Sequence, residues 1–219
     1  GVAILSSMII GFPGQDRHPI LQDLRQLQAL GPAWWQILIY FAFPGTPLHE
    51  SALTEDLYHS NYRVNPDYRQ FDGLSMHFKH RNFSPAELEN LQRQLYRDNF
   101  ERLGPSIVRI IQTWFKGWRH MSNASSPLLR DRAKQMRKYV ESALPGLYPA
   151  AFLGPNRTQR RKARILIRQI RSEFGSPSLF DCLSGWATLP LAGWTWLAAR
   201  LHIRQQPRLL RVEYSKDVR

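Results

Sequence analysis

Two short apolar runs, each closed by a Phe-Pro-Gly turn, constrain the fold of this 219-residue chain more than any other feature. The first is "SSMIIGFPG" (residues 6–14) and the second is "LIYFAFPG" (residues 38–45). Apolar runs rich in β-branched residues that end in Gly and Pro are typical of buried strands. We therefore predict strands over residues 2–10 and 34–43.

The segment between the two runs predicts a helix. Its apolar residues recur at helical spacing, and Gly31 follows where helices commonly end. These residues are Ile20, Leu21, Leu24, Leu27 and Leu30. A strand, a helix and a second strand joined by short loops form a βα unit whose strands run parallel. Strands that are apolar throughout also predict a sheet covered on both faces. Residues 1–50 are thus expected to belong to a (β/α) barrel or an open sheet.

The rest of the chain is mainly helical by its pattern. Residues 51–83 predict a long irregular connection with short elements, and Ser84, Pro85 and Glu87 then form an N-terminal capping signal. Further helices are expected after residues 105, 126 and 157. The uncharged stretch 182–199 predicts a buried helical hairpin, because Pro190 interrupts it, and residues 208–216 predict a short strand. The expected fold class is α/β followed by mainly α.

Charge divides the chain unevenly. Residues 1–60 hold two Arg against five acidic residues (−3), whereas residues 61–219 hold 28 Lys and Arg against 12 acidic residues (+16). We therefore expect two regions, 1–60 and 61–219, with a basic surface on the second, most of all on the helix 158–174. Such a surface attracts phosphate, nucleic acid or anionic lipid without distinguishing among them.

Signals for metal and thiol chemistry are weak. The single cysteine, Cys182, excludes an intramolecular disulfide and fits a reducing compartment. His77 and His80 have a spacing that zinc ligands use, but no cysteine or paired carboxylate lies at a matching distance. We therefore interpret both histidines as ordinary packed or solvated side chains and predict no metal site.

The first turn, "GFPGQD" (residues 11–16), is a candidate ligand site. It follows the carboxyl end of a strand, which is where α/β folds bind ligands. Gly11 has no side chain, so a ligand could approach its backbone closely. A plain turn between a strand and a helix is an equally good interpretation of the same residues.

The order of motifs resembles a known family. "MIIGFPG", an amphipathic helix and then "PGTPL" resemble the last strands of the partial barrel of radical S-adenosylmethionine enzymes, most of all the cobalamin (B12)-binding-domain subclass. "FSPAELENLQRQLYRDNFERLGPSIVRI" is similar to the helical tail of hopanoid-methylase-like members. The barrel motifs cover residues 1–50, and the similarity of the tail covers residues 70–140.

The resemblance implies a site for adenine. It places Ile9 against the adenine ring, makes Gly11 the glycine that follows, and assigns backbone contacts with adenine to Tyr40, Phe41 and Ala42. Residues 1–60 would then be the C-terminal end of the barrel. This part would supply the adenine pocket and cover the substrate in a methyltransferase-like modification of a carbon centre. Which residues are catalytic is unknown.

The resemblance also implies that parts of the enzyme lie upstream of Gly1. The three-cysteine motif that holds a [4Fe-4S] cluster and the cobalamin domain are absent from these residues. S-adenosylmethionine, the cluster and cobalamin would therefore be bound mainly by an N-terminal half-barrel and a cobalamin domain of the same polypeptide. We expect this fragment to be inactive without them.

A non-enzymatic alternative is a basic helical module that binds nucleic acid or an anionic membrane, which the pI near 10.5 favours. Nucleic acid is the weaker partner, because the basic residues are interleaved with core positions and no helix-turn-helix motif stands out. The tryptophan-rich stretch 182–199 would suit peripheral contact with a membrane or a lipid-like substrate. We expect a cytoplasmic protein with possible contact at a membrane surface.

Overall fold

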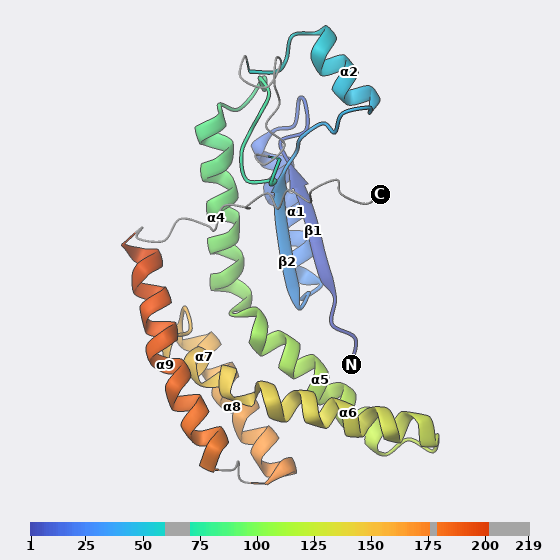
Figure 1. Cartoon of the computed structure of the whole chain (residues 1–219), viewed down its shortest axis with the longest axis vertical. Helices are drawn as coiled ribbons and strands as arrows, with labels where there is room; N and C mark the ends of the chain where they lie inside the picture. Colours follow the sequence, from blue (N-terminus) through green and yellow to red (C-terminus); the bar gives the residue numbers. More distant parts are fainter. Residues whose placement is uncertain (60–70, 176–178, 202–219) are drawn as a thin grey trace, which may run out of the picture.

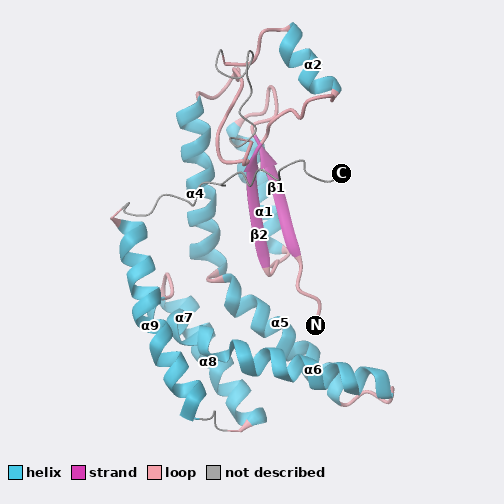
Figure 2. Ribbon diagram, in the orientation of Figure 1, coloured by secondary structure: helices cyan, strands magenta, loops and turns pink. Residues whose placement is uncertain are grey.

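The computed structural model describes residues 1–59, 71–175 and 179–201 (Figures 1 and 2). Their fold is α/β with mostly helices, which confirms the expected fold class, and the sheet in the described residues has two strands. The order is β1 (Leu5–Ile10), α1 (Arg17–Ala29), β2 (Trp34–Ile39), α2 (Pro47–Thr54), α4 (Pro85–Leu103), α5 (Ser106–Ser122), α6 (Pro127–Ala143), the 3₁₀ turn η2 (Leu144–Gly146), α7 (Leu147–Leu153), α8 (Arg157–Phe174) and α9 (Leu179–Arg200).

The two predicted strands are parallel neighbours, in register from Leu5 opposite Trp34 to Ile10 opposite Ile39. Because the strands are parallel, both Phe-Pro-Gly turns lie at the same end of the sheet, as Figure 1 lets the reader follow. Both strands are shorter than predicted. β1 begins at Leu5 rather than at residue 2, and residues 40–43 continue β2 as irregular chain.

The sheet is covered on one face only, in contrast to the prediction. Met8, Ile10, Ile37 and Ile39 are buried with α1 and α4 in one hydrophobic cluster. On the opposite face, 55% of Leu5, 44% of Ile9 and 55% of Trp34 are exposed. The prediction of two covered faces is therefore wrong for the described residues, which cover one face of the sheet. We call this exposed side, with Leu5, Ser7, Ile9, Trp34 and Gln36, the open face; Leu38, at its carboxyl end, is half-buried beside Gly73.

The outer edge of β2 is closed by side chains of α4. Gln92 Nε2 donates hydrogen bonds to the carbonyl oxygens of Ile37 (2.7 Å) and Gly73 (2.9 Å). The Tyr96 hydroxyl accepts from the Ile37 amide (2.8 Å) and donates to the Ile37 carbonyl (3.1 Å). The Ile39 amide donates to the carbonyl of Gly73 (2.7 Å). These bonds replace a further strand, so the sheet ends at β2 on this side.

The outer edge of β1 has no such cover. The carbonyls of Ile4 and Ile10 accept bonds from the amides of Trp34 and Tyr40. Because backbone groups alternate along a parallel strand, those of Leu5, Ser7 and Ile9 point away from β2. Within the described ranges no strand pairs with them. The sheet therefore has one closed edge and one open edge.

The irregular connection predicted for residues 51–83 contains short elements in its described part, as expected. Helix α2 occupies its beginning, and an antiparallel bridge joins Tyr58 to Phe78. Residues 60–70 lie outside the described part of the chain. The bridge returns the chain to the carboxyl end of the sheet before α4 begins.

Two hydrophobic clusters build the core. The first holds the sheet, α1 and α4, and it includes residues on both sides of the expected region boundary at residue 60, such as Ile10 and Leu95. The second holds α5 to α8, with Val108, Ile111 and Ile170 among its members. Helix α4 therefore packs with the sheet, and the second cluster begins with α5, which follows Gly104 (Figure 1).

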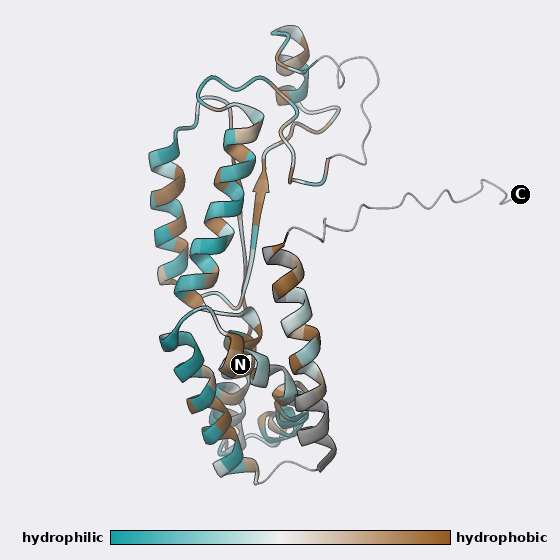
Figure 3. Cartoon of the chain, turned by 90° about the vertical axis from the view of Figure 1, so that its left-hand side faces the viewer, coloured by the Kyte–Doolittle hydropathy of each residue, from teal (hydrophilic) through white to brown (hydrophobic). Residues whose placement is uncertain are grey.

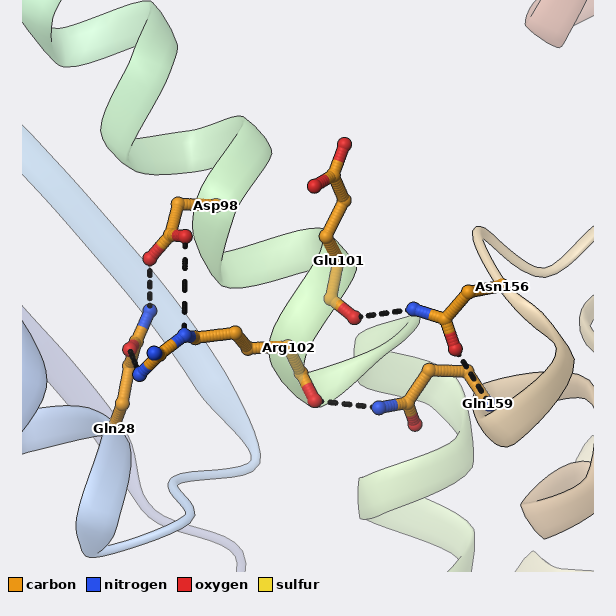
Figure 4. Close-up of polar contacts among 6 residues, drawn as sticks. All are labelled: Gln28, Asp98, Glu101, Arg102, Asn156 and Gln159. Atoms are coloured by element: carbon orange, nitrogen blue, oxygen red, sulfur yellow. Dashed lines mark hydrogen bonds and ion pairs between the residues drawn. The ribbon is translucent and has the colours of Figure 1, made fainter.

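A polar junction joins α1, α4 and α8 at this boundary (Figure 4). Gln28 of α1 donates to Asp98 (3.1 Å) and accepts from Arg102 (3.2 Å), both on α4. Asn156 Nδ2 donates to the carbonyl of Glu101 (2.8 Å), and Gln159 Nε2 donates to the carbonyl of Arg102. The carbonyls at the end of α4, which lack partners inside their own helix, are thus satisfied from the beginning of α8.

We expect Asn156→Ala to lower the free energy of unfolding by about 1 to 2 kcal/mol. Asn156 Oδ1 caps α8 by accepting from the Gln159 amide (3.0 Å), and its Nδ2 binds α4, so alanine removes both bonds. Asn156→Ser is the matched control, because serine keeps a capping oxygen and loses only the bond to α4. Urea unfolding measures both. Equal losses in the two variants would contradict a contribution from the cap.

The C-terminal stretch is one helix, not a hairpin. Helix α9 runs from Leu179 to Arg200 with Pro190 inside it, so the predicted hairpin is wrong. Pro190 is exposed, and the carbonyl that a proline leaves unpaired can bond to water there. Among the described helices, none combines the length and the apolar character needed to cross a bilayer. The strand predicted for residues 208–216 lies outside the described residues.

Candidate functional site

The carboxyl end of the sheet is built on two β-turns with the same backbone pattern. The Gln15 amide donates to the Phe12 carbonyl (2.9 Å), and the Thr46 amide donates to the Phe43 carbonyl (3.1 Å). Each turn has proline at its second position and, at its third, a glycine with positive φ: 78° for Gly14 and 82° for Gly45. This is the pattern of a type II turn, which explains why both strands end in the same three residues.

Gly11 has a packing role that the sequence did not indicate. Its φ is +82°, and a Cβ at this position would lie 2.4 Å from Cδ2 of Leu88 on α4. Leu88 is fully buried, so it has little room to move. The Gly11 amide donates to Gln15 Oε1 (2.8 Å). The side of Gly11 where a side chain would project is therefore filled by α4 and is closed to a ligand.

His80 fixes the first turn from outside. A carbonyl only accepts hydrogen bonds, so the 2.7 Å contact between His80 Nε2 and the Phe12 carbonyl requires a proton on Nε2. His80 Nδ1 accepts from the Asn82 amide (3.0 Å), and the Asn82 side chain donates to Asp16 (2.7 Å). Both ring nitrogens of His80 are thus engaged within the protein. Among the described residues, no group of three potential ligands gathers to hold a metal ion.

The residues assigned to adenine lie at the adjacent carboxyl ends of β1 and β2. Ile9 is on the open face beside Ser7, whose hydroxyl donates to Gln36 (3.1 Å). Gly11 follows β1 directly, and the Tyr40 amide donates to the Ile10 carbonyl (2.7 Å). The structure therefore brings Ile9, Gly11 and Tyr40 together at the end of the two strands. Ile9 is exposed, whereas Gly11 packs against α4.

Phe41 and Ala42 differ in how their backbones are used. The Ala42 carbonyl accepts from the Tyr58 hydroxyl (3.3 Å). Within the described part of the chain, the amide and carbonyl of Phe41 have no hydrogen-bond partner. The Phe41 ring is held by Phe43 and Phe71, with centroids 4.5 and 5.3 Å away. Phe41 therefore combines a fixed ring with free backbone groups.

Tyr58 and His49 were not among the predicted site residues. Tyr58 is buried, and its hydroxyl lies 2.7 Å from His49 Nδ1. Burial, and then the nearby Tyr40, raise the pKa of Tyr58, and burial raises the pKa of Tyr40. Both phenols are therefore neutral at physiological pH. Their grouping depends on the bridge between Tyr58 and Phe78, for which the local sequence carries no periodic signal.

Comparisons with protein-family models, with curated proteins and with solved structures found no match for this chain.

Proposed function

We propose that this chain is the C-terminal part of a radical S-adenosylmethionine enzyme of the cobalamin-dependent subclass, which modifies a carbon centre by methyl transfer. The observation that supports this most is the parallel pair β1–β2 with its two Pro-Gly turns at one end and Ile9 exposed beside them. The whole enzyme would contain S-adenosylmethionine, a [4Fe-4S] cluster and cobalamin. When bound, these groups supply the radical and the methyl group.

The described residues fit an adenosine but not the metal cofactors. A purine needs an apolar surface for its ring and polar groups for its edge. Ile9 offers the surface, and the free amide and carbonyl of Phe41 offer the polar groups. An iron-sulfur cluster of this kind is held by three cysteines, and the chain has one. The role proposed for this chain is therefore to bind and orient the adenosine.

The open edge of β1 supports a further strand that pairs with it. Parallel strands normally lie inside a sheet with both faces covered, and a two-stranded parallel sheet on its own is unusual. Here the backbone groups of Leu5, Ser7 and Ile9 point outward, and the open face exposes Leu5 and Trp34. We propose that the N-terminal half-barrel of the same polypeptide adds a strand along β1 and covers the open face.

Residues encoded upstream of Gly1 give the first test. We expect them to contain a Cys-x-x-x-Cys-x-x-Cys motif, and an upstream reading frame without one overturns the proposal. In the full-length protein, Ile9→Asp should weaken binding of S-adenosylmethionine by about tenfold or more, because the bound adenine ring would remove a carboxylate from water. Ile165→Asp is the matched control: Ile165 is 39% exposed, close to the 44% of Ile9, but lies on α8. Equal affinity of the two variants for S-adenosylmethionine would show that Ile9 does not contact adenine.

One observation favours a second function, contact with an anionic membrane surface. Four large apolar residues form an exposed stripe along one face of α9 and the residue that follows it: Leu191, Trp194, Leu197 and Leu201. An apolar groove of about 460 Å³, lined in part by Phe100, Ile107 and Leu153, runs beside it. Exposed apolar residues that include tryptophan suit the interface of a bilayer and are of little use on nucleic acid.

Positive charge lies on α8, which packs on α7 as α9 does. Helix α7 contacts both α8 and α9, and Arg160 and Arg164 of α8 donate to carbonyls of residues 154 and 151 beside it. Figure 3 shows the hydrophilic α8 and the more apolar α9 in the same part of the molecule. A protein that carries both an exposed apolar stripe and many basic side chains is complementary to lipids with negatively charged headgroups. We infer that the occupant of this surface is an anionic bilayer.

Flotation with vesicles tests this second function. We expect the chain to bind vesicles that contain phosphatidylglycerol and not those of phosphatidylcholine alone. Trp194→Glu should reduce binding by about tenfold, because it places a charge in the apolar stripe. Leu128→Glu is the control, since Leu128 is 77% exposed but lies on α6. Binding to duplex RNA without binding to vesicles would contradict contact with a membrane and favour nucleic acid as the partner.

A further inference from the structure

A small apolar cavity lies beside the second Pro-Gly turn, where β2 ends. Its volume is about 200 Å³, and residues from β2's extension, α2 and the bridge between Tyr58 and Phe78 line it. The residues that define its chemistry are Tyr40, Ala42, Glu55, Tyr58 and Phe78. Tyr40 and Ala42 line the cavity and also belong to the residues assigned to adenine, whereas Ile9, Gly11 and Phe41 do not line it, so the cavity adjoins the site proposed for adenine.

Three aromatic rings form the walls of the cavity. The rings of Tyr40 and Phe78 meet edge to face, with centroids 5.5 Å apart and planes inclined by 79°. Tyr58 is held by His49 Nδ1 (2.7 Å) and by the Ala42 carbonyl (3.3 Å). Phe12 packs on Tyr40 from outside, with centroids 4.8 Å apart. The walls are therefore fixed in place before any ligand enters.

The charge around the cavity is negative although the chain is strongly positive. Glu55 is the one ionisable carboxylate in the lining, and none of the described residues that line the cavity is lysine or arginine, in a chain that has 30 of them. Glu50 lies on α2, and Glu55 caps the carboxyl end of that helix. Residues 1–60 together carry a net charge of −3. An anion would therefore be repelled by Glu55 and would find no basic partner in the lining.

Aromatic walls with a carboxylate at the rim are suited to one class of ligand. The faces of Tyr and Phe rings carry negative potential and attract cations, most of all bulky cations that are weakly hydrated. A neutral apolar molecule would fill the space without using Glu55, and a small hydrated cation would lose its water without replacement ligands. We propose that this cavity binds a compact alkylammonium cation, of which a quaternary ammonium group is the best-fitting form.

Titration of the 219-residue chain with choline and with 3,3-dimethylbutan-1-ol, observed by NMR, tests the proposal. The two molecules have the same shape, but only choline is charged. We expect choline to bind about tenfold or more tightly than the alcohol, because only a cation gains from the aromatic faces and Glu55. Equal binding, tighter binding of the alcohol, or no binding of choline at millimolar concentration overturns the proposal.

Substitutions in the lining separate the charge from the space. Glu55→Gln should weaken choline binding by about fivefold, whereas Glu50→Gln, on the same helix but outside the lining, should leave it unchanged. Tyr58→Leu removes an aromatic face and should weaken binding by about tenfold, and Tyr58→Phe, which keeps the ring, should retain most of it. Because Tyr58 is buried, circular dichroism and the binding of Tyr58→Phe distinguish a lost site from a lost fold. If Tyr58→Leu is folded and binds choline as the parent does, the proposal fails.

Discussion

Gly11→Ala is expected to lower the free energy of unfolding by about 3 kcal/mol, since it combines backbone strain with overpacking. Gly11 has a φ of +82°, a value that residues with a Cβ rarely adopt. The new Cβ would also lie 2.4 Å from Cδ2 of Leu88, a side chain of α4 that is fully buried. Urea unfolding followed by circular dichroism measures the loss.

Gly14→Ala separates the two causes. Gly14 has nearly the same φ, +78°, but a Cβ there would meet no atom within 4 Å. It should therefore cost only the strain, about 1 to 2 kcal/mol. The rest of the loss in Gly11→Ala comes from the contact with Leu88. The double variant Gly11→Ala/Leu88→Ala should therefore be more stable than the sum of the two single losses predicts, because the new methyl group occupies space that Leu88 leaves. Equal losses for Gly11→Ala and Gly14→Ala would show that Leu88 moves aside freely.

Gln92→Glu is expected to destabilise the protein by about 3 to 5 kcal/mol at pH 7. Glutamate has nearly the shape of glutamine, but a carboxylate can only accept hydrogen bonds. At this position it would face the carbonyl oxygens of Ile37 and Gly73, which now accept from Gln92 Nε2. Thermal unfolding over a range of pH measures the effect.

The pH dependence identifies the cause. Burial and the facing carbonyls would raise the pKa of the new carboxyl group above its value in the unfolded chain, because only its protonated form can donate a bond. The lost stability should therefore return in part as the pH falls through that raised pKa. Gln94→Glu, exposed on the same helix and beside Arg17, is the control and should be close to neutral. A loss that does not change with pH would mean that packing, not hydrogen bonding, makes glutamine necessary.

Local signals predicted the elements well. The capping residues of α4 formed the expected box, with Ser84 and Glu87 bonding to each other's backbone. The parallel pairing of the strands followed from the helix between them, because α1 carries the chain back along β1 and β2 then starts at the same end of the sheet. These features depend on neighbours within a few residues, which a sequence displays directly.

Contacts between distant segments could not be predicted. Gln92 and Tyr96 stand next to the apolar stripe of α4 and resemble solvated residues, yet they complete the edge of a strand more than 50 residues earlier. The open face was missed because an apolar strand has the same composition whether its second face is covered or exposed. Pro190 indicated an interruption, and the exposed position of α9 tolerates it. The aromatic cavity arises from a bridge whose two sides are 20 residues apart.

The closure of β2 by α4 has a consequence during synthesis of the protein. Gln92 and Tyr96 follow Ile37 by 55 and 59 residues, so the ribosome delivers the strand well before the side chains that cover its edge. At ordinary elongation rates of about 5 to 20 residues per second, this delay lasts roughly 3 to 12 s. In that interval a nascent chain exposes an uncapped apolar strand containing Trp34 and Trp35, which makes it a natural substrate for chaperones that bind emerging polypeptides.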